Sequence, residues 1–138
     1  MSRRRASFRP LLALLLLSCG VFPSYSRAPD PARDCAKGNG TSSERASALL
    51  LEGARVFDER CSPCHGNTGH GDGLLADLLP IRPRNYHADA FRWGSGWDDI
   101  AATVRGGRSG VMPPFEGALS EPEIRAVSFL VACWVQHR

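Results

Sequence analysis

The sequence predicts an all-α fold with three main helices joined by loops rich in glycine and proline. Three observations lead to this class. Apolar residues recur at helical spacing in three segments of the chain. No stretch alternates apolar and polar residues for long enough to form a strand, and glycines and prolines crowd the segments between the helical ones. A chain of 138 residues is long enough for one such domain.

The N-terminal segment has the pattern of an export signal. Arginines at positions 3, 4, 5 and 9 precede an apolar run over residues 11–17, and small residues follow. The run is shorter than the roughly 20 residues of a membrane-spanning helix. Residues 16–19, Leu-Leu-Ser-Cys, resemble the lipobox of bacterial lipoproteins, which predicts a signal over residues 1–19 and a lipid anchor on Cys19. The alternative is ordinary cleavage after Ser26, with a signal over residues 1–26. Either route places the mature chain in the periplasm or elsewhere outside the cytoplasmic membrane.

The charge of the chain does not indicate nucleic-acid binding. The whole sequence has 17 basic and 14 acidic residues, but five arginines lie in residues 1–27, where no acid occurs. Residues 28–138 therefore carry a net charge of −2, and the basic excess belongs to the signal.

Residues 20–42 are rich in proline, serine and glycine and are expected to form a flexible tether, followed by a folded domain over residues 43–138. The first helix of that domain is expected to start with Ser42 or Ser43 as its N-cap. A run over residues 74–79 can make a helical turn, and a second helix is expected over residues 97–105. The last helix begins at Ser120, in a capping box with Glu123.

The segment Cys61-Ser62-Pro63-Cys64-His65 is typical of c-type haem attachment. Cysteines three apart on a helical turn place both sulfur atoms on one face, and the following histidine projects beside them. Cys61 and Cys64 would hold haem c covalently, and His65 would bind the iron. The alternatives are a zinc site, which needs four ligands, a thioredoxin-like redox pair, and a structural disulfide between the two cysteines.

Met112 is the candidate for the second axial ligand. It is the one methionine after the initiator, and Pro113 keeps it out of helical conformation. Methionine opposite histidine fills the iron and raises its reduction potential. His70, His87 and His137 are the rival ligands; His70 follows His65 too closely to reach the opposite face.

With these residues identified, residues 44–138 resemble a class I monohaem cytochrome c, especially the small cytochrome modules of terminal oxidases and dehydrogenase complexes. The resemblance rests on the haem motif, on residues 69–73 and 79–84, on Gly53 and Phe57 before the motif, and on the Met-Pro-Pro-Phe segment. It implies a cytochrome c-like all-α fold wrapped around one covalent haem.

The resemblance also implies roles for particular residues. The first and last helices should cross steeply, with Gly53 and Phe57 packed against Phe129, Leu130 or Trp134. A proline carbonyl should accept the Nδ1 hydrogen of His65, with Pro80 as the first candidate and Pro83 as the second. Four further residues are candidates for contacts with the haem propionates: Arg84, Tyr86, Trp93 and Arg108. Cys35 and Cys133 form a disulfide or remain as a free and a buried thiol, and the sequence leaves both open.

The predicted function is electron transfer rather than enzymatic catalysis. With His65 and Met112 both bound to iron, no position remains for a substrate, and the chain offers no other catalytic pair. The expected partners are redox proteins, a donor and an acceptor, met by a free carrier or by a subunit of a larger oxidoreductase; no small-molecule substrate is expected. The alternative function is a haem c enzyme subunit or gas sensor with a labile distal ligand.

Overall fold

The computed structural model describes Cys35 and residues 41–137. Its helices, in chain order, are α2 (Thr41–Arg60), α3 (Ser62–His65), the 3-10 helix η1 (Ala76–Leu78), α4 (Trp97–Gly106) and α5 (Glu121–Gln136). Within these residues no strand forms, and β-type pairing is limited to isolated bridges. The prediction of an all-α fold is confirmed. The helical turn and the two later helices lie where the sequence predicted them.

The predictions for the N-terminal part are tested only where the structure describes it. The predicted signal and Cys19 lie outside the described residues, as does most of the predicted tether over residues 20–42. The N-cap prediction is wrong, because α2 already includes both Ser42 and Ser43. Among the helices of the described part, none combines the length and apolar character that a bilayer crossing requires.

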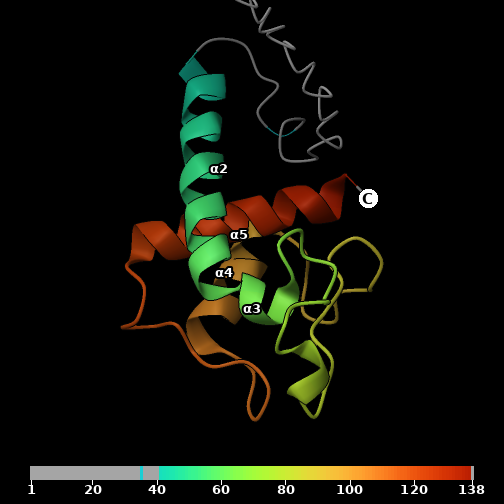
Figure 1. Ribbon diagram of the computed structural model, residues 1–138. Helices are drawn as coiled ribbons and strands as arrows, with labels where there is room; N and C mark the ends of the chain where they lie inside the picture. Colours follow the sequence, from blue (N-terminus) through green and yellow to red (C-terminus); the bar gives the residue numbers. More distant parts are fainter. Residues whose placement is uncertain (1–34, 36–40, 138) are drawn as a thin grey trace, which may run out of the picture.

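Helices α2 and α5 cross steeply and pack closely (Figure 1). A Cβ atom added at Gly53 would lie 2.4 Å from the carbonyl oxygen of Ala126 and 3.1 Å from the Cβ atom of Leu130, so the missing side chain lets the helices approach. One turn further along, the rings of Phe57 and Trp134 meet edge to face with centroids 4.8 Å apart. Leu130 and Trp134 are therefore confirmed as partners of the first helix.

Phe129 packs against a different helix. Its ring lies 5.1 Å from that of Trp97 at the start of α4, which corrects its candidacy as a partner of α2. The indole N–H of Trp97 donates a hydrogen bond of 2.7 Å to the carbonyl of Arg125, and the Arg125 guanidinium lies 4.1 Å from the centre of the same ring. These contacts fasten α4 to α5.

The beginning of α5 has the predicted capping box. The backbone N–H and the hydroxyl of Ser120 both donate to Glu123 Oε2, at 2.8 and 2.7 Å. Pro122 occupies the first turn, where its missing N–H costs no hydrogen bond. Further along, every residue of 130–135 is buried, so this half of α5 forms the centre of the domain.

A disulfide joins Cys35 to Cys133 on α5, with their Cα atoms 5.9 Å apart. Of the two alternatives that the sequence left open, the structure therefore has the bridge. Cys133 is 2% exposed, so the bond ties the segment before α2 to the interior of the domain.

Candidate haem site

The Cys-x-x-Cys-His motif forms a single helical turn. Cys61 is the N-cap residue of α3, and its carbonyl accepts hydrogen bonds from the backbone N–H groups of Cys64 and His65, at 3.1 and 2.8 Å. Both cysteines have free thiols, with Cys61 buried and Cys64 half-buried. Burial raises the pKa of the Cys61 thiol to about 12, and the neighbouring Cys64 adds to the rise. Two free thiols beside an imidazole are a donor set that fits covalent haem c.

The loop that follows α3 folds back over it and fixes its orientation. All four carbonyls of the helix accept backbone hydrogen bonds of 2.8–3.2 Å from this loop; the donors to Ser62, Pro63, Cys64 and His65 are Gly66, Leu75, Gly73 and Gly71, respectively. A Cβ atom added at Gly73 would lie 2.5 Å from backbone atoms of Ser62, Pro63 and Cys64, so the return path needs glycine. The motif is thus held by its backbone as well as by its neighbours.

The imidazole of His65 is oriented by a backbone carbonyl. Its Nδ1 atom lies 3.4 Å from the carbonyl oxygen of Arg84, which makes a long hydrogen bond. Burial lowers the pKa of His65 below its usual value, although the bond to Arg84 opposes the shift. With Nδ1–H donated to a carbonyl, the lone pair of Nε2 is left for a metal.

The acceptor for His65 is therefore Arg84 rather than Pro80, the residue favoured by the sequence. Pro80 follows η1 and is exposed. After η1 the chain approaches the motif again at residues 83–86. There the Tyr86 N–H donates to the Gly69 carbonyl at 2.8 Å, and a Cβ atom added at Gly71 would lie 2.3 Å from the carbonyl oxygen of Pro83. The sequence carries no signal for this acceptor, because every residue has a carbonyl.

Arg84 and Tyr86, predicted as propionate contacts, have other partners here. The Tyr86 ring is buried and stacks on the imidazole of His65 with centroids 4.9 Å apart, and burial raises the pKa of its hydroxyl. The guanidinium of Arg84 donates to the carbonyl of Ala90 and lies 4.8 Å from the centre of the Phe91 ring. Their propionate contacts stay predictions.

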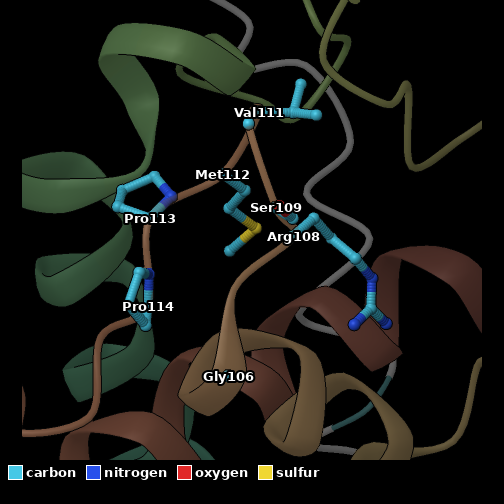
Figure 2. A pocket seen from close by; sticks show the side chains of 8 residues that line it. Gly106, Arg108, Ser109, Val111, Met112, Pro113 and Pro114 are labelled. Atoms are coloured by element: carbon cyan, nitrogen blue, oxygen red, sulfur yellow. The ribbon is translucent and has the colours of Figure 1, made fainter.

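Met112 lies in a tight loop after α4. The N–H of Arg108 donates to the Met112 carbonyl at 2.8 Å, and the N–H of Met112 returns a bond of 2.9 Å to Arg108. Gly110 makes the turn between them with a φ of 75°, a conformation that favours glycine. The loop lines a hollow in which Figure 2 shows the Met112 side chain between Pro113 and Pro114 on one side and Arg108 on the other.

The loop after Met112 is anchored to the C-terminal end of α4. The N–H groups of Phe115 and Glu116 donate to the carbonyls of Val104 and Arg105, at 3.1 and 3.2 Å. Met112 is half-buried and packs against the core. Met112 thus has a supported backbone outside any helix, and the sequence predicted this non-helical conformation from Pro113.

The rival histidines have contacts of their own. The rings of His70 and His87 stack with centroids 4.5 Å apart, and His87 Nε2 lies 2.7 Å from the carbonyl oxygen of Thr68. His70 therefore belongs to the loop that follows His65, and His87 packs against that loop. His137 is exposed directly after α5.

Residues 48–128 match the family described as cytochrome C oxidase, cbb3-type, subunit III. The chain is 32% identical over 85 residues to the cbb3-type cytochrome c oxidase subunit CcoP of Cereibacter sphaeroides, covering 62% of this chain and 27% of that protein. It is 28% identical over 123 residues to CcoP of Rubrivivax gelatinosus, covering 89% of this chain and 31% of that one.

Among solved structures, a chain of a reducing HAO-like protein complex from Kuenenia stuttgartiensis is similar, with a TM-score of 0.56 and 30% identity. The likeness covers 60% of this chain and 41% of that chain. With respect to the CcoP proteins that it matches, this chain spans about a quarter to a third of their length.

Proposed function

We propose, from the premise that this chain belongs to the cbb3-type cytochrome c oxidase subunit III family, that it is an electron carrier with one covalent haem c bound by His65 and Met112. Membership makes it a c-type cytochrome domain. The number of haems, the ligand pair and the partners are the parts proposed here.

The haem motif supplies the attachment and the first ligand. The S–H bonds of Cys61 and Cys64 would each add across a vinyl group of the porphyrin, giving two thioethers with no leaving group. His65 would bind iron through Nε2 while its Nδ1–H stays on the carbonyl of Arg84. This imidazole, oriented by the carbonyl of Arg84 and followed back along one helical turn by two free thiols, is the observation that carries the proposal.

Met112 would supply the second ligand and leave the iron without an open position. Haem so bound exchanges single electrons, and the chain's part is to orient the ligands and to exclude water from them. Among the described residues, no group of three or more His, Cys, Asp or Glu side chains is arranged to hold a metal ion. A haem therefore accounts for the motif better than zinc does.

The proposed setting is the periplasmic side of a membrane, where attachment takes place in bacteria, with a lipid on Cys19 as the anchor. The donor and acceptor would be redox proteins of a respiratory or dehydrogenase chain. The relatives are named as subunits of cbb3-type oxidases, which makes such a complex the first place to look for them.

The test is expression of the full chain in a host that matures c-type cytochromes. We expect an intact mass that includes one haem, and this haem should stay attached after the protein is denatured. The Cys61→Ala, Cys64→Ala double variant should lack the covalent haem. Met112→Ala should keep the haem, lower the reduction potential and bind carbon monoxide rapidly. A colourless wild-type protein, or rapid carbon monoxide binding without any substitution, would contradict the proposal.

A further inference from the structure

The guanidinium of Arg108 makes three contacts with the described part of the protein. Its Nη2 atom donates a hydrogen bond of 2.6 Å to the hydroxyl of Thr103 on α4, and Nη1 donates one of 3.2 Å to the carbonyl of Gly107. Its guanidinium carbon lies 4.5 Å from the centre of the Trp93 ring. One side chain thus joins the end of α4 to the loop before that helix.

The backbone of the same residue pairs with Met112. The Arg108 carbonyl accepts from the N–H groups of Met112 and Val111, at 2.9 and 3.0 Å, and the Arg108 N–H bonds to the Met112 carbonyl. Figure 2 shows the side chain of Arg108 extending away from Met112, so its hydrogen bonds fasten the outer side of the loop. Contacts that fix the position of the Arg108 side chain therefore also help to fix the backbone position of Met112.

The contact with Arg108 offers a reason for the exposed position of Trp93. It is 59% exposed, and large aromatic residues are seldom left so open. The covering guanidinium gives its ring a cation–π contact. The segment that ends at Trp93 starts at Arg84, the residue whose carbonyl accepts the hydrogen bond from His65. The segment 84–93 therefore reaches from the His65 side of the site to the Met112 side.

We propose that Arg108 is a positioning residue for Met112: its guanidinium locks the 108–112 loop against Thr103 and Trp93, which holds the thioether in place for ligation. This inference rests on the proposed function, because it takes Met112 as the distal ligand. It assigns Arg108 and Trp93 a different role from the propionate contacts that the resemblance suggested.

The experiment compares haem-loaded Arg108→Ala, Arg108→Lys, Thr103→Val and Trp93→Ala proteins with the wild type. Three readouts are measured: the sulfur-to-iron charge-transfer absorption of the ferric protein, the affinity for added imidazole, and hydrogen exchange at the amides of Val111 and Met112. Arg92→Ala is the matched control, because it removes the same charge from an exposed position next to Trp93. Trp93→Phe is a second control, because it keeps an aromatic face.

We expect Arg108→Ala to weaken the absorption, to bind imidazole roughly tenfold more tightly, and to exchange both amides faster, because at least one charge-assisted hydrogen bond is lost. Thr103→Val and Trp93→Ala should change all three readouts in the same direction, and they test the proposal even if Arg108→Ala fails to fold. Lysine cannot reproduce the planar fork, so Arg108→Lys should resemble the alanine variant.

Two results would overturn the inference. One is unchanged absorption, imidazole affinity and exchange in the Arg108, Thr103 and Trp93 variants, even if the potential shifts. The other is wild-type behaviour of Arg108→Lys, since charge alone would then suffice. Met112→Ala separates this failure from that of the proposed function. If Met112→Ala keeps the absorption, the ligand assignment is wrong; if it alone loses the absorption, only the role of Arg108 is wrong.

Discussion

The ring of Tyr86 stacks on the imidazole of His65, with centroids 4.9 Å apart and planes inclined by 15°. The same tyrosine meets Phe57 of α2 edge to face at 6.3 Å and lies 6.2 Å from Trp134 of α5. His65 is therefore connected through one buried ring to the place where α2 and α5 cross. The orientation of the proposed iron ligand depends on the packing of the main helix pair.

Tyr86→Ala should lower the free energy of unfolding by about 3–5 kcal/mol, because it leaves a cavity between His65 and the two helices. Tyr86→Phe keeps the ring and should change stability by less than about 1.5 kcal/mol. Denaturant unfolding of the haem-loaded protein measures both values. Equal stability of the two variants would mean that the stacked ring is not part of the core.

Gly53→Ala should destabilise the protein by about 1–3 kcal/mol, because its Cβ would collide with the backbone of Ala126 and push the helices apart. In most exposed helical positions the same change stabilises. Thermal unfolding measures the effect. Ala54→Leu, which adds bulk to the exposed neighbouring position, is the control and should stay within about 0.5 kcal/mol of the wild type.

Cys35→Ser should lower stability by up to about 4–5 kcal/mol, the chain-entropy value for a disulfide that spans 98 residues. Denaturant unfolding with and without a reductant tests this. Reductant should destabilise the wild type to the level of the variant and leave the variant itself unaffected. If reductant leaves the unfolding curve of the wild type unchanged, that result would argue against the bridge.

Glu123 should make stability depend on pH in the acid range. Hydrogen bonds from the hydroxyl and N–H of Ser120, with a further one from Arg55, lower the pKa of Glu123 to about 2. The folded state thus binds this proton less readily than the unfolded state. The stabilisation is complete above the ordinary glutamate pKa of about 4.5 and is lost as the pH falls toward 2.

Glu123→Gln tests this prediction, because glutamine can still cap the helix but does not titrate. The difference in unfolding free energy between wild type and variant should be largest near neutral pH and vanish near pH 2. Glu116→Gln, an exposed change before α5, is the control. A difference that does not vary with pH would remove the carboxylate from its proposed role.

Local patterns were sufficient for the elements whose causes are local. The capping box at Ser120 and the apolar spacing placed α4 and α5, and the five-residue motif pointed to the candidate haem site. Phe129 shows where this ends: residues 130–135 are all buried, so α5 has no single apolar stripe to tell which side meets α2. The sequence could not predict the Arg84 carbonyl as the acceptor for His65, because this contact depends on how the loop over α3 closes.

The bridge between Cys35 and Cys133 closes a covalent ring around nearly the whole described domain. The haem motif and the Met112 loop both lie inside this ring. A protease that cuts once in any loop between the two cysteines would therefore leave both fragments on one molecule, and a gel would separate them only after reduction. A singly nicked protein would therefore keep its two proposed ligands, His65 and Met112, on one covalently joined molecule.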